Sequence, residues 1–103
     1  MTDNNQKALS MIGLATKAGK LVSGEFSVEA AVRKGKAQMI IIAEDASANT
    51  KKSFQDMSTY YRVPLYIFGT KESLGRYTGK GIRTSIAILD PGFSATIRKL
   101  IQQ

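Results

Sequence analysis

The sequence contains neither cysteine nor histidine among its 103 residues. Without cysteine, disulfides, thiolate zinc sites and thiol nucleophiles are excluded. Without histidine, Ser-His-Asp chemistry, imidazole general bases and most transition-metal sites are excluded as well. Only eight residues carry carboxylate side chains, so the chain is poorly equipped for acid–base catalysis. We therefore expect a protein that is not an enzyme and has no catalytic residues, no metal site and no cofactor.

Long apolar runs are also missing. No stretch of about eighteen apolar residues is present, so we expect no membrane-spanning helix. The polar start MTDNNQKALS lacks the apolar segment of a signal peptide. These features predict a cytoplasmic protein with no membrane partner. The absence of repeats, linkers and low-complexity tracts predicts a single domain over residues 1–103.

What the sequence has in excess is positive charge. Fifteen Lys and Arg residues against eight Asp and Glu give a net charge of +7. Such a balance favours a polyanionic partner, and nucleic acid is the first candidate. The alternative is that the charge only keeps a small protein soluble.

Apolar periodicity predicts strands and helices in strict alternation along the whole chain. Strands are expected at 20–22, 39–43, 65–68 and 85–89, and helices at about 5–17, 24–35, 47–61, 70–78 and 91–103. Asp45 and Ser47 are candidate caps for the third helix, and Thr70 for the fourth. The alternation alone predicts a compact αβα sandwich with a largely parallel sheet.

The stretch AGKLVSGEFSVEAAVRKGK, residues 18–36, is the first candidate site. A short strand enters a helix through Ser23 and Gly24, which leaves unpaired N–H groups and the positive end of the helix dipole at one corner. Such a corner attracts phosphate. Phe26 has two interpretations: it stacks on an unpaired base, or it packs in the core. The predicted phosphate corner consists of Ser23, Gly24, Glu25, Phe26 and Ser27, flanked by Lys17 and Lys20.

A second candidate is the glycine-rich basic stretch GRYTGKGIR, residues 75–83. It is not a P-loop, because it lacks the GK[ST] ending and follows a helix. As a loop it offers backbone N–H groups, cations and one exposed apolar side chain, a combination that suits RNA. The alternative is a flexible connector. The candidate residues are Gly79, Lys80, Ile82 and Arg83.

Two acidic residues, Glu44 and Asp45, follow the second predicted strand. Open α/β sheets bind ligands at the carboxyl ends of their strands, so a magnesium or catalytic role is one interpretation. The simpler interpretation is that Asp45 caps the next helix.

Three segments together resemble one family. They are GLATKAGKLVSG at 13–24, IAEDASANTKK at 42–52, and the segment from Leu74-Gly75 through Gly79 to IAILDPG at 86–92. In this order they are similar to the kink-turn RNA-binding superfamily of ribosomal proteins, of the L seven Ae and L thirty e type, and most of all to its bacterial YlxQ-like branch.

The resemblance implies a three-layer αβα sandwich with about five helices and a four-stranded mixed sheet, in which the last strand is antiparallel. It also implies RNA binding without catalysis. The family's contact regions correspond here to Ser23–Ser27, Glu44-Asp45 and Gly79–Arg83. We expect a non-catalytic, monomeric ribonucleoprotein component that acts in translation and binds structured RNA, associated with ribosomal RNA or the ribosome.

The chain departs from the kink-turn binders at one place. Counting back from Gly35, the polar residues that read the sheared G·A pairs in the family fall on Phe26, Ser27 and Ala30. This departure supports an alternative function, a protein-interaction module of the translation or transcription machinery that has lost kink-turn specificity.

Overall fold

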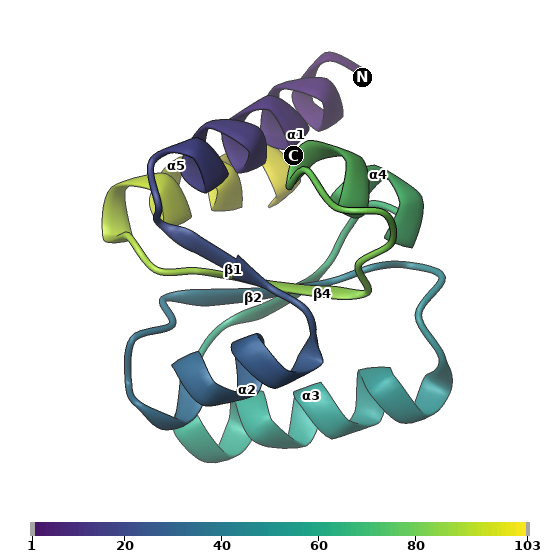
Figure 1. The fold of residues 1–103 in the computed structure, drawn as a ribbon. Helices are drawn as coiled ribbons and strands as arrows, with labels where there is room; N and C mark the ends of the chain where they lie inside the picture. The colour runs from purple at the N-terminus through teal and green to yellow at the C-terminus, as the bar shows by residue number, and fades with distance from the viewer. Residues whose placement is uncertain (1, 103) are drawn as a thin grey trace.

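The computed structural model describes residues 2–102 and contains helices and strands in strict alternation (Figure 1). In chain order they are α1 (Thr2–Lys17), β1 (Leu21–Ser23), α2 (Glu25–Arg33), β2 (Met39–Ile42), α3 (Ala48–Tyr61), β3 (Leu65–Ile67), α4 (Lys71–Tyr77), β4 (Ser85–Ile88) and α5 (Pro91–Gln102). Apart from the first helix, which begins earlier, the predicted elements differ from these by only a few residues at their ends. Within residues 2–102, no helix combines the length and the apolarity that crossing a membrane requires.

The strands form one mixed sheet in the order β1-β4-β2-β3. Only β2 and β3 pair in parallel, whereas β4 lies antiparallel to both β1 and β2. The largely parallel sheet expected from alternation is therefore wrong, and the mixed sheet implied by the resemblance is confirmed. The reason is that segment 71–83 folds back on itself, since the N–H of Arg83 donates to the carbonyl of Lys71 at 3.0 Å. The chain therefore enters β4 at the same end of the strands at which β3 finishes.

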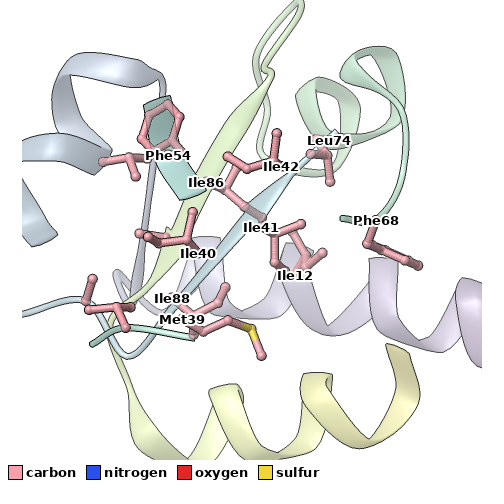
Figure 2. Close-up of a cluster of buried hydrophobic side chains, with 14 of the residues drawn as sticks. Ile12, Met39, Ile40, Ile41, Ile42, Phe54, Phe68, Leu74, Ile86 and Ile88 are labelled. Carbon is pink, nitrogen blue, oxygen red and sulfur yellow. The ribbon is translucent and has the colours of Figure 1, made fainter. Parts of the chain in front are cut away.

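Helices cover both faces of the sheet. The helices α1, α4 and α5 lie on one face, and α2 and α3 lie on the other (Figure 1). The central strands β2 and β4 are buried along their whole length, which explains the continuously apolar MIII of β2. Figure 2 shows Met39 directed toward α5, and Phe54 of α3 approaching the opposite face. The core thus fills both layers, as in an αβα sandwich.

Four connecting segments lie together at one edge of the sheet. The strands β1, β2 and β3 run in the same direction, so their carboxyl ends meet at this edge, where the antiparallel β4 begins. The helices α2, α3 and α4 therefore also start here, on the right in Figure 1. We call this the carboxyl edge. It comprises residues 23–27, 43–50, 69–71 and 79–85.

Candidate RNA-binding surface

The three predicted contact segments meet at the carboxyl edge. The N–H of Gly24 donates to the carbonyl of Ser85 at 2.9 Å, which joins the phosphate corner to the start of β4. The N–H of Ala43 donates to the carbonyl of Thr84 at 2.9 Å, which joins the loop after β2 to the same strand. Residues 60 positions apart in the chain thus form one surface.

The first turn of α2 is open. Its N-cap is Gly24, with φ 93° and no side-chain cap hydrogen bond. This positive φ is one that glycine adopts without strain. Within residues 2–102, the N–H groups of Glu25, Phe26 and Ser27 have no hydrogen-bond partner. The terminus therefore has the free donors and the dipole that bind an anion.

The sequence suggested that Asp45 caps α3, but in the structure it does not. The N-cap of α3 is Ser47, whose Oγ accepts from the N–H of Thr50 at 3.1 Å. Asp45 instead accepts the N–H of Lys71 through Oδ1 at 2.8 Å, in the first turn of α4. Asp45 thus accepts an N–H from the first turn of a helix, but the helix is α4 and the partner residue lies 26 positions further along the chain. Only the tertiary fold creates this pairing.

Two apolar side chains project from this surface. Phe26 is 86% exposed and Ile82 is 57% exposed. The interpretation that places Phe26 in the core is therefore wrong; α2 is anchored instead by Val28, Ala31 and Val32. Exposed aromatic rings are the kind of side chain on which unpaired bases stack in proteins that bind single-stranded nucleic acid.

The loop Gly79–Arg83 is held against α4 rather than being an unanchored connector. The N–H of Lys80 donates to the carbonyl of Gly75 at 2.7 Å. A Cβ atom at Gly75 would collide with the carbonyl group of Gly81, so the loop occupies the space that a side chain would fill. This close approach explains the glycine in the middle of α4.

Ser23 and Arg83 form a contact that sequence reasoning missed. The guanidinium Nε of Arg83 donates to Ser23 Oγ at 3.0 Å, and Nη1 donates to the carbonyl of Ile82 at 2.9 Å. No local pattern relates the two residues, and only the pairing of β1 with β4 brings them together.

The structure does not bring Lys20 to this surface. Lys20 precedes β1, and its carbonyl accepts the N–H of Leu89 at 2.8 Å, at the opposite end of the strand from Ser23. At about 3.3 Å per residue, the two lie roughly 10 Å apart. Lys51 does reach the carboxyl edge, where its Nζ donates to the carbonyl of Glu44 at 2.7 Å.

Carboxylates at this edge are dispersed. Glu25 accepts from the hydroxyl of Thr50 at 3.3 Å, and Asp45 is engaged with α4. Within residues 2–102, no group of three or more Asp, Glu, His or Cys side chains is placed to hold a metal ion. The arrangement thus offers N–H groups, cations and exposed apolar side chains.

Comparison with known proteins identifies the family of this chain. Residues 6–98 match the model of the ribosomal protein L7Ae/L30e/S12e/Gadd45 family. The chain belongs to this family. It is 41% identical over 99 residues to the RNA-binding protein YlxQ of Enterococcus faecium, covering 96% of this chain and 95% of that protein. It is 38% identical over 91 residues to the RNA-binding protein YlxQ of Bacillus subtilis, covering 88% and 91%.

A solved structure is also similar throughout. A protein of unknown function from Bacillus halodurans superposes with a TM-score of 0.90 at 38% identity, covering 94% of this chain and 98% of the other. The YlxQ-like branch expected from the sequence is thus confirmed. The family and the names of these relatives point to a non-enzymatic protein.

Proposed function

We propose that this protein is a non-catalytic RNA-binding protein that binds structured RNA through the phosphate corner Ser23–Ser27 and the loop Gly79–Arg83. Membership of the ribosomal protein L7Ae/L30e/S12e/Gadd45 family and the relatives named as RNA-binding proteins support RNA as the ligand. Ribosomal RNA is the expected partner, and translation the expected process. The proposal places the protein in the cytoplasm as a monomer.

The observation that carries this proposal is the meeting of three kinds of RNA-binding group at one edge. The open first turn of α2 offers N–H groups to a phosphate. Lys80 and Arg83 supply charge from the adjacent loop. Phe26 and Ile82 offer apolar contact to splayed bases. Single-stranded or bulged RNA presents both phosphates and splayed bases, whereas a regular duplex hides its bases.

Kink-turn recognition is the finer form of this proposal. At the positions where the family reads sheared G·A pairs, this chain has Phe26, Ser27 and Ala30. Neither a phenyl ring nor a methyl group can form hydrogen bonds with base edges. We propose that a kink-turn RNA is bound mainly through its bent backbone and its unstacked nucleotides. The corner would therefore be less selective for the G·A pairs than the polar readers are.

The direct test is the variant Lys80→Ala/Arg83→Ala, with RNA affinity measured across a salt series. If three or four phosphates are neutralised, the wild-type protein has a slope of log affinity against log salt of roughly −3. Loss of two phosphate contacts makes the slope shallower by about 1.5 and weakens binding at low salt. The matched control is Lys34→Ala/Lys36→Ala, which removes the same charge beyond the C-terminal end of α2, away from the carboxyl edge. Equal effects of the two variants would contradict the assignment of the loop.

A second candidate function is a protein-interaction module of the translation or transcription machinery. The loss of polar readers at Phe26 and Ala30 favours it. Affinity capture from lysate, with and without ribonuclease, separates the two functions. Partners that depend on RNA disappear after digestion, whereas a direct protein partner stays bound.

A further inference from the structure

The guanidinium group of Arg83 is fixed in place before any ligand arrives. The backbone N–H of Arg83 donates to the carbonyl of Lys71, and the N–H of Lys71 in turn donates to Asp45. In the side chain of Arg83, Nε donates to Ser23 Oγ and Nη1 donates to the carbonyl of Ile82. The phosphate corner therefore contacts the side chain of Arg83, whereas the loop after β2 is linked to its backbone through Lys71.

These bonds are donated by Nε and Nη1, so the third nitrogen, Nη2, keeps both of its N–H groups available. An arginine has five N–H donors in a fixed fork. Nε and one N–H of Nη1 are used here, so Nη2 and the second N–H of Nη1 have no partner within the described residues. Together they form the terminal fork that binds two oxygens of a phosphate at once.

The guanidinium of Arg83 lies next to the N-cap residue of α2. A Cβ atom built on Gly24 would stand 3.8 Å from Arg83 Nε, so the guanidinium packs against the backbone at the N-cap. The unpaired N–H groups of Glu25, Phe26 and Ser27 follow immediately. The unpaired amides and the arginine thus lie at the same helix terminus.

We propose that Ser23 is a positioning residue, which holds Arg83 so that its terminal fork binds an RNA phosphate at the N-terminus of α2. This inference rests on the proposed function and assigns Arg83 and Ser23 different roles in RNA binding. Arg83 contacts the phosphodiester, whereas Ser23 acts through Arg83 and does not contact RNA itself. Asp45 is linked through Lys71 to the backbone of Arg83 and not to its side chain.

The closing experiment is a double-mutant cycle with Ser23→Ala and Arg83→Gln. The probe is a fluorescein-labelled kink-turn RNA, a stem interrupted by a short bulge and tandem G·A pairs, and its affinity is measured by anisotropy at several salt concentrations. Ser23→Ala should weaken binding about five-fold with an unchanged salt slope, since the charge stays in place. Arg83→Gln should weaken it roughly 20-fold and make the slope shallower by about one. The double variant should bind no more weakly than Arg83→Gln alone.

Two further variants and one spectrum isolate the positioning role. Ser23→Thr keeps a hydroxyl at the same atom and should restore near wild-type affinity. Ser94→Ala removes a hydroxyl from α5, outside the three contact segments, and should have little effect. In the free protein, the Arg83 Nε–H signal should be protected from solvent exchange, and Ser23→Ala but not Ser94→Ala should remove this protection.

Each of the following results would contradict one part of the inference. A further loss of affinity when Ser23→Ala is added to Arg83→Gln would mean that Ser23 contacts RNA directly. Weaker binding by Arg83→Gln with an unchanged salt slope would mean that Arg83 contacts a base edge rather than a phosphate. Normal wild-type binding without an effect of Ser23→Ala would contradict this inference alone. A wild-type protein that binds neither this RNA nor ribosomal RNA would contradict the proposed function and, with it, the RNA role of the pair.

Discussion

Three helices begin at the carboxyl edge, and they begin in two different ways. The helices α3 and α4 are closed by side chains: Ser47 caps the first, and a reciprocal pair of Thr70 and Ser73 caps the second. Asp45 satisfies one more N–H of α4. The helix α2 begins at Gly24, which has no side chain with which to cap. One terminus is thus left open beside two that the protein closes itself.

The difference teaches that an open terminus costs little stability and is useful for binding. Glycine at an N-cap is only a few tenths of a kcal/mol worse than serine or threonine. A capping side chain would occupy the N–H groups that a phosphate needs. The exposed Phe26 and the side chain of Arg83 both lie at the open terminus, although the backbone N–H of Arg83 is bonded to Lys71 at the start of α4. The groups that suit RNA are therefore gathered where the helix is left incomplete.

The largest effect is expected from Gly75→Ala, because the new methyl group would push the loop 79–83, beside the open terminus, away from α4. The new Cβ would collide with the backbone at Gly81, whose carbonyl carbon would be 2.8 Å away. Overpacking of this kind costs about 2 kcal/mol of unfolding free energy. We expect this loss in urea denaturation, together with weaker RNA binding because residues 79–83 are displaced.

The control for this substitution is Gly13→Ala in the middle of α1. There a Cβ would meet the carbonyl oxygen of Tyr77 at 3.5 Å, an ordinary contact. Since alanine favours a helix over glycine by roughly 0.5–1 kcal/mol, this variant should be as stable as the wild type or slightly more so. If Gly75→Ala were equally well tolerated, the packed loop would not describe the protein in solution.

The second prediction compares two exposed aromatic side chains at opposite ends of the molecule. Phe26, 86% exposed, lies at the open terminus, whereas Tyr60, 79% exposed, lies at the far end of α3 in edge-to-face contact with Tyr61. Phe26→Ala should leave the stability within about 0.5 kcal/mol of wild type. It should weaken RNA binding roughly ten-fold through the loss of a stacked base.

Tyr60→Ala is the matched comparison in the same anisotropy titration. It removes an equally accessible ring at a distance from the carboxyl edge, so RNA affinity should stay unchanged. Similar losses from both variants would indicate that exposed rings contribute without regard to position, and the corner would lose its special status.

Local patterns predicted most of the fold and part of the site. The alternation of apolar segments predicted every helix and strand, because each buries a face that its own residues define. The direction of β4 could not be predicted in this way, because it depends on where the excursion from Lys71 to Arg83 returns to the sheet.

The same distinction holds within the site. The open corner at Gly24 was predictable, because a strand followed by a glycine and a helix is a local pattern. The pairs Ser23–Arg83 and Asp45–Lys71 were not, because their partners are 60 and 26 residues apart. The exposure of Phe26 was also undetermined by sequence, since the choice of helix face depends on how α2 lies on the sheet.

The smallest effect is expected from opening one of the closed termini. Thr70→Ala removes the hydroxyl that accepts the N–H of Ser73 at 3.0 Å, so it should cost about 1 kcal/mol. For a domain of this size the melting temperature should fall by about 4–8 °C. Because α4 has no exposed ring or unpaired arginine fork at its start, opening it should not increase RNA affinity. Thr70→Ser should keep the cap and most of the stability. Tighter RNA binding by Thr70→Ala would show that any uncapped terminus at this edge suffices, and that Phe26 and Arg83 do not decide where the phosphate binds.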